Sequence, residues 1–193
     1  MGYLVEAFLN SFFPLFLVID VFGLVPIFHS LMKDFKKIDR IRNANRATYL
    51  ASILLFLFLF FGDKILFIFG VSISSFKIAG GIIILILGLR IILGLKMVGE
   101  HISKYSMAAV PIATPLLVGA GVISTVIILV DQFGYIIPFI AAVINLLIVW
   151  LVLRYSEEIL GRVGHQGTDI MSRIMGIILT ALAVEFIRAG FGF

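Results

Sequence analysis

Long apolar runs separated by short polar stretches organise this chain. Six runs approach or exceed the length of about 20 mostly apolar residues that a helix needs to cross a bilayer. We predict spans at about 3–31, 44–61, 76–95, 107–130, 135–153 and 172–189, with basic or polar loops at 33–46, 96–105 and 154–169. A short apolar piece at 65–70, set off by Asp63 and Lys64, is predicted to be a re-entrant or interfacial turn. The pattern predicts an all-α polytopic membrane protein, one transmembrane domain over 1–193.

Two of these helices carry residues that favour an interruption. The first holds Asp20, Gly23 and Pro26 inside its apolar run and is too long for one straight crossing. Proline removes a backbone donor and clashes with the preceding turn, so we predict two pieces meeting between Asp20 and Pro26. The fourth is predicted to break between Pro115 and Gly121. Lipid cannot satisfy the freed backbone groups, which must therefore face protein, water or a ligand.

The two halves of the chain resemble each other. A shift of 96 residues aligns Gly23 with Gly119, Lys77 with Arg173, Ile78 with Ile174 and Gly80 with Gly176. The breaks, short loops and basic helix starts also follow in the same order. Because each half holds three spans, the second half must enter the membrane upside down. We therefore predict two inverted three-helix repeats, about 1–96 and 97–193, as in many secondary transporters.

Composition and charge narrow the class of protein. The chain is 62% hydrophobic and only 13% charged, which excludes an ordinary soluble domain. It has no cysteine, so disulfides and thiolate metal sites are excluded. The net charge of +4 comes mainly from the loops after the first, third and fifth spans. These basic residues orient a membrane protein rather than bind nucleic acid. We predict a cell-membrane protein with both termini outside the cytoplasm.

Asp20 is the leading candidate for chemistry. An ionised carboxylate at mid-membrane costs about 2.5–3.5 kcal/mol on insertion scales, and such residues are usually paired or functional. We predict that Asp20 couples to protons or contacts a substrate amine, the alternative being a protonated aspartate that caps a broken helix. Amides at Gly119 and Gly121 can donate to a substrate carboxylate, since a helix N-terminus attracts anions. The alternative for these glycines is close helix packing.

Further polar residues flank the second break or lie inside later helices. The hydroxyls of Thr114, Ser124 and Thr125 can line a site, although mid-helix hydroxyls often bond back to their own helix. Glu185 is a second candidate for proton coupling, and Arg188 one turn later can instead simply pair with it.

The remaining polar residues favour structural roles. Asn145 is predicted to make an interhelical hydrogen bond, and Arg90 to reach the membrane interface with its long side chain. The histidines, His29, His101 and His165, lack the spacing of a metal site. No nucleophile–base set is evident. We therefore expect no enzyme, no cofactor and no metal.

Two longer motifs and two shorter ones carry a family resemblance. They are Asp20-Val21-Phe22-Gly23-Leu24-Val25-Pro26-Ile27-Phe28, Pro115-Leu116-Leu117-Val118-Gly119-Ala120-Gly121-Val122-Ile123-Ser124-Thr125, Phe76-Lys77-Ile78-Ala79-Gly80-Gly81 and Arg173-Ile174-Met175-Gly176. Together they resemble the MarC family of multiple-antibiotic-resistance-related membrane proteins, and more specifically its archaeal small neutral amino acid transporter branch. Val21 and Ala120 stand where the family pattern has proline, and Leu24 where it has asparagine. The resemblance implies transport of glycine, alanine or similar amino acids, driven by a proton gradient.

We therefore expect a secondary transporter of small neutral amino acids, of the glycine, alanine and serine class, with the proton as coupling ion. The expected substrate-binding residues are Asp20, Gly23, Pro26, Thr114, Gly119, Gly121, Ser124 and Thr125, and those for proton coupling are Asp20 and Glu185. A lining of glycine, alanine and hydroxyl groups would favour small substrates. The alternatives are a solute channel, an exporter of another small metabolite, or a non-transporting accessory protein.

Overall fold

The regular secondary structure of the described chain is entirely helical. The computed structural model describes residues 2–32, 35–95 and 118–192. Its helices in chain order are α1 (Gly2–Ile19), α2 (Val21–Met32), α3 (Lys37–Ile68), α4 (Ile73–Ile92), α6 (Ala120–Phe133), α7 (Ile136–Arg154) and α8 (Ser156–Phe191). Over these ranges no strand occurs, so the all-α class is confirmed.

Five helical stretches are long and apolar enough to cross a membrane. They are Gly2–Pro26, Lys37–Ile68, Ile73–Ile92, Ile136–Arg154 and Ser156–Phe191. Helix α6 is also apolar, but its 14 residues are fewer than a full crossing needs. The predicted fourth span lies partly outside the described residues, and α6 is its described portion. A polytopic membrane protein is therefore confirmed, whereas the sixth complete span stays a prediction.

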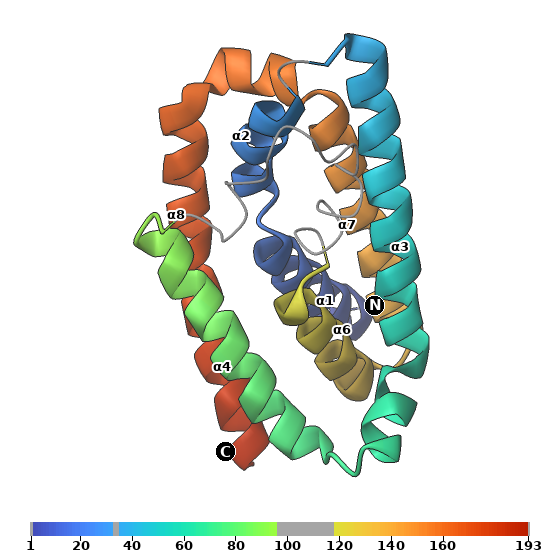
Figure 1. The fold of residues 1–193 in the computed structure, drawn as a ribbon. Helices are drawn as coiled ribbons and strands as arrows, with labels where there is room; N and C mark the ends of the chain where they lie inside the picture. The colour runs from blue at the N-terminus through green and yellow to red at the C-terminus, as the bar shows by residue number, and fades with distance from the viewer. Residues whose placement is uncertain (1, 33–34, 96–117, 193) are drawn as a thin grey trace.

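The helices surround a central pair (Figure 1). Helices α1 and α6 pack against each other in the middle of the molecule, with α4 and α8 on one side and α3 and α7 on the other. Many large aliphatic side chains on the outer faces of α4 and α8 are exposed, among them Ile82, Leu89, Ile177 and Val184. In a membrane these faces would contact lipid, because a helix that exposes apolar residues to water is unstable.

Helices α4 and α8 approach closely along a seam of small residues. A Cβ atom added to Gly81 would lie 2.8 Å from the carbonyl oxygen of Ala183, and one added to Gly190 would lie 2.8 Å from that of Ser74. A Cβ on Gly88 would lie 3.1 Å from the carbonyl oxygen of Gly176. Small residues let two backbones pack this closely in a membrane. The seam fixes how α4, which carries part of the candidate site, is held by α8.

The structure corrects several predicted boundaries. Helix α3 runs without interruption through Asp63 and Lys64 to Ile68, so 65–70 is not a separate interfacial piece. The segments predicted as loops at 33–46 and 154–169 are mostly helical: α3 begins at Lys37 and α8 begins at Ser156. Helix α8 changes direction at Gly164, where φ is 73° and ψ is 167°. Charged residues near a helix end can reach water without ending the helix, and hydropathy alone therefore misplaces these boundaries.

Candidate functional site

The first membrane stretch is interrupted at Asp20. Helix α1 ends one residue before it and α2 begins one residue after it. Asp20 itself has φ 48°, in the left-handed region that residues other than glycine seldom adopt. The Gly23 amide donates to Asp20 Oδ1 at 3.2 Å, and the Leu24 amide donates to the Asp20 carbonyl oxygen at 3.1 Å. Asp20 therefore caps the N-terminus of α2, the alternative that the sequence left open.

The interruption covers fewer residues than predicted, only Asp20 rather than the stretch from Asp20 to Pro26. Both Pro14 and Pro26 lie inside continuous helices, so neither one separates α1 from α2. The carboxyl group of Asp20 faces α8, where the Ser172 hydroxyl lies beside it. Ser172 is buried, with 8% of its surface exposed. The carboxyl thus lies at a contact between the α1–α2 junction and α8, away from bulk water.

The N-terminus of α6 provides a second set of polar backbone groups. Gly119 precedes the helix in an extended conformation and, being a glycine, offers no side chain of its own to cap the helix start. The first amides of a helix have no partner within the helix and carry the positive end of its dipole. Those amides belong to Ala120, Gly121 and Val122.

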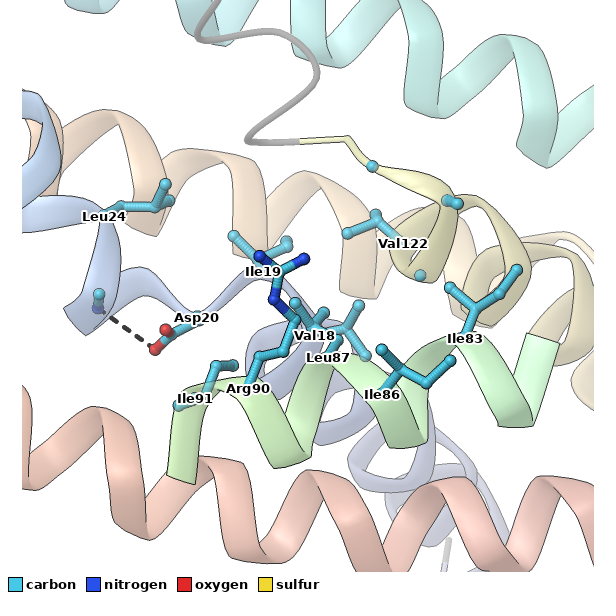
Figure 2. Close-up of a pocket in the computed structure, with 14 residues that line it drawn as sticks. Val18, Ile19, Asp20, Leu24, Ile83, Ile86, Leu87, Arg90, Ile91 and Val122 are labelled. Atoms are coloured by element: carbon cyan, nitrogen blue, oxygen red, sulfur yellow. Dashed lines mark hydrogen bonds between the residues drawn. The ribbon is translucent and has the colours of Figure 1, made fainter. Parts of the chain in front are cut away.

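A cavity of about 300 Å³ joins these two features (Figure 2). Its walls come from the α1–α2 junction, from α4 and from the start of α6. The lining residues are Val18, Ile19, Asp20, Gly23, Leu24, Ile83, Ile86, Leu87, Arg90, Ile91, Gly119, Ala120, Gly121 and Val122. The structure therefore brings Asp20 and Gly23 together with Gly119 and Gly121, four of the residues that the sequence singled out.

The residues that line the cavity are more apolar than the predicted lining of glycine, alanine and hydroxyl groups. Branched aliphatic side chains form most of the wall, and the hydroxyls of Ser124 and Thr125 are not part of it. Thr125 Oγ1 donates to the Gly121 carbonyl oxygen at 2.8 Å, so it bonds back to its own helix. Ser124 is buried against α4, where its Cβ lies 2.8 Å from the position that a Cβ on Gly80 would take. A hydrogen bond within α6 holds the Thr125 hydroxyl, and packing against α4 holds Ser124, so neither hydroxyl lines the cavity.

Other expected site residues lie elsewhere. Pro26 is half-buried in α2 and does not line the cavity. Thr114 falls outside the described residues. Glu185 is on an exposed face of α8, where Arg188 Nη1 lies 3.3 Å from its Oε2. The role of Glu185 in proton coupling stays a prediction. The interhelical bond of Asn145 is confirmed, because its Nδ2 donates to the Phe12 carbonyl oxygen at 3.2 Å.

Arg90 is the lining residue whose place the sequence did not predict. It occupies the last turn of α4, and its side chain points into the cavity between α1 and α6 (Figure 2). The expectation from sequence was an arginine that reaches the membrane interface. A usable signal was present, because Ile83, Ile86, Leu87 and Arg90 follow the helical spacing that places residues on one face.

Comparison with known proteins identifies the family. The family model for MarC family integral membrane proteins matches residues 5–192. A UPF0056 membrane protein of Archaeoglobus fulgidus is 40% identical over 200 residues, covering 98% of this chain and 93% of the relative. The UPF0056 membrane protein YhcE of Escherichia coli K12 is 31% identical over 195 residues, covering 95% and 91%. No solved structure matches significantly. The chain therefore belongs to the MarC family of integral membrane proteins.

Proposed function

We propose that this protein is a secondary transporter of small neutral amino acids, of the glycine, alanine and serine class, coupled to protons. The solute binds in the cavity between the α1–α2 junction, α4 and the N-terminus of α6. Alternating access then exposes the cavity first to one side of the membrane and then to the other. In this proposal both termini lie outside the cytoplasm, because the predicted loops richest in lysine and arginine belong inside.

The observation that carries the proposal is that a carboxyl group and the N-terminus of α6 line one cavity. Asp20 offers a negative partner to an ammonium group, and the amides at Ala120 and Gly121 offer donors to a carboxylate. A zwitterionic amino acid carries both groups. The cavity volume of about 300 Å³ lies at the lower end of the range for small-molecule sites, roughly 300–1,000 Å³. The aliphatic wall suits a neutral side chain.

The packing of the helices supports an inverted repeat. A shift of 96 residues carries α3 approximately onto α7, α4 onto α8 and the α2 region onto α6. Helix α2 packs against α7 and α8, while α6 packs against α3 and α4, so the corresponding helices have corresponding neighbours. In transporters with this symmetry, substrate lies where the interrupted helices of the two repeats meet.

The proposal is tested by uptake of labelled glycine into proteoliposomes, with and without an imposed pH gradient. Asp20→Asn is the informative variant, because asparagine tolerates the left-handed region and is an equally good helix cap. It removes the titratable group and leaves the local fold in place. We expect wild-type uptake to rise with the proton gradient, and uptake by Asp20→Asn to lose that dependence.

Two further variants sharpen the result. Asp169→Asn removes an exposed carboxyl from α8 outside the cavity and should leave uptake unchanged. Glu185→Gln tests the second candidate for proton coupling, and because Glu185 pairs with Arg188 on an exposed face we expect a smaller loss of coupling than in Asp20→Asn. Undiminished gradient-driven uptake by Asp20→Asn would remove the coupling role of Asp20. A channel would instead show non-saturating flux, and an accessory protein would show no solute binding.

A further inference from the structure

We propose that Arg90 is the residue that binds the carboxylate of the transported solute, and that it restricts the site to monocarboxylate zwitterions. This inference rests on the proposed function and assigns the carboxylate contact to a side chain. The α6 amides then act as supporting donors. The ligand class that follows is an α-amino acid with an uncharged side chain.

The chemistry of arginine is the first reason. An arginine side chain within a membrane-spanning segment is costly and usually faces a partner or a water-filled cavity. Its guanidinium stays charged under all ordinary conditions and carries five N–H donors, so it can bind a solute carboxylate together with other partners. The planar fork matches the two oxygens of a carboxylate, which an ammonium group such as that of lysine does not.

The geometry of the cavity is the second reason. Arg90 comes from α4, whereas Asp20 comes from the α1–α2 junction, and both line the same space (Figure 2). They are the charged side chains among the described lining residues, and the rest of the wall is aliphatic or glycine. A zwitterion supplies the ammonium for Asp20 and the carboxylate for Arg90 at the same time.

The start of α6 reinforces this polarity. Gly119, Ala120 and Gly121, at the N-terminus of α6, line the cavity together with Arg90. The positive end of a helix dipole and a guanidinium both favour an anionic group. Among the described lining residues, Arg90 and the start of α6 thus form the positive side of the cavity, and Asp20 supplies the carboxyl group.

A selectivity rule follows from this arrangement. An amine without a carboxylate cannot make the contact with Arg90, and a carboxylate without an amine cannot make the contact with Asp20. An acidic or basic side chain on the solute would add a charge against an aliphatic wall, where an unpaired charge is strongly disfavoured. Neutral amino acids should therefore bind better than glycinamide, acetate, aspartate or lysine.

The test measures binding to the purified full-length protein in detergent, by thermal shift and by equilibrium binding. The probes are glycine, glycinamide, which lacks the carboxylate, and acetate, which lacks the amine. Arg90→Gln removes the guanidinium charge, and Arg90→Lys keeps a charge but loses the fork. Arg188→Gln is the matched control, since it removes an exposed arginine outside the cavity.

We expect the wild type to prefer glycine over glycinamide. Arg90→Gln should weaken glycine binding about tenfold or more, because charge-assisted hydrogen bonds are lost, and should leave glycinamide binding nearly unchanged. Arg90→Lys should bind glycine with an affinity between those of the wild type and Arg90→Gln. Arg188→Gln should bind glycine as tightly as the wild type. The ligand series on the wild type gives a readout even if Arg90→Gln does not fold.

Two results would overturn the inference. One is a wild type that binds glycine and glycinamide equally well, and the other is an Arg90→Gln variant that keeps the wild-type preference for glycine. Both can occur while glycine uptake persists, in which case the transport proposal stands without Arg90. Conversely, acetate binding that depends on Arg90 in a protein that takes up no amino acid would support the carboxylate site and contradict the transport proposal.

Discussion

The carboxyl group of Asp20 fills the space that a Cβ atom on Gly23 would occupy. The same hypothetical Cβ would lie 3.2 Å from the Ser172 hydroxyl of α8. Glycine at position 23 therefore permits the cap that Asp20 places on α2, and it permits the close approach of α8 to this junction. The α1–α2 junction, the Asp20 cap and the contact with α8 all depend on the absence of a side chain at Gly23.

Gly23→Ala should accordingly displace the Asp20 carboxyl. The added methyl group overlaps that carboxyl, so the Asp20 side chain must rotate and give up the hydrogen bond from the Gly23 amide. Loss of a helix cap costs about 1 kcal/mol, and the change also alters the negative side of the cavity. We expect a lower unfolding temperature in detergent and at least a severalfold loss of glycine uptake. Gly161→Ala, where nothing lies within 4 Å, is the control and should be neutral or slightly stabilising.

The ion pair between Lys77 and Asp131 should hold α4 against α6 near the N-terminal end of α4, the end opposite Arg90. Lys77 Nζ lies 2.7 Å from Asp131 Oδ2, and the two side chains are 15% and 37% exposed. A double-mutant cycle with Lys77→Gln and Asp131→Asn should give a coupling energy of about 1 kcal/mol. The same cycle on Glu185 and Arg188, whose side chains are about 60% exposed, should give a smaller value. Equal coupling in the two pairs would contradict the role assigned to burial.

The α4–α8 seam should tolerate no added methyl group. In an open helix position, Gly→Ala is stabilising by roughly 1 kcal/mol. At Gly81 the new Cβ would lie 2.8 Å from the Ala183 carbonyl oxygen and 3.1 Å from the Ile187 amide nitrogen, and backbone atoms cannot move aside cheaply. Gly81→Ala should therefore lower the unfolding temperature, whereas the Gly161→Ala control should not. A stabilised Gly81→Ala variant would show that the two helices are not in tight contact.

Tyr135 gives a prediction about alkaline pH. Its hydroxyl donates to Asp63 Oδ2 at 2.8 Å, and this hydrogen bond raises the pKa of Tyr135 above its ordinary value near 10. A raised folded-state pKa means that the stabilisation is present below the unfolded-state pKa and is lost as the pH rises through the folded-state pKa. A tyrosinate titration, taken as the wild type minus Tyr135→Phe, should show the raised value. Asp63→Asn should bring it back toward the ordinary value.

Much of the fold follows from hydropathy, because the length of apolar runs is set by the bilayer. The interruption near Asp20 was also predictable, since a carboxyl group, a glycine and a proline cluster there. The sequence did not show that the interruption is only one residue wide. Pro26 suggested a wider break, but it lies within α2, whose N-terminus Asp20 caps. Likewise, charges such as Asp63 suggested a helix end, but a side chain near a membrane surface can be hydrated while the helix continues.

The sequence predicted the backbone features of the candidate site but not the side chains that line it. Asp20 lies between two helices and Gly119 directly precedes one, and the residues that favour helix ends are visible in a sequence. The direction of a side chain on an intact helix depends on packing instead. Ser124 turns toward Gly80, and Arg90 turns into the cavity because the opposite face of α4 is taken by the seam with α8. The spacing of Ile83, Ile86, Leu87 and Arg90 indicates that they share a face of α4, but the sequence does not show which helices that face meets.

The most direct test of the cavity as a solute site uses the absence of cysteine from the chain. Ala120→Cys places a single thiol on the cavity lining at an exposed position, and Val163→Cys places one on an exposed face of α8 as the control. The rate of maleimide labelling is then measured with and without saturating glycine. We predict that glycine slows labelling at position 120 and leaves position 163 unchanged. Labelling at position 120 that no neutral amino acid slows would contradict the account.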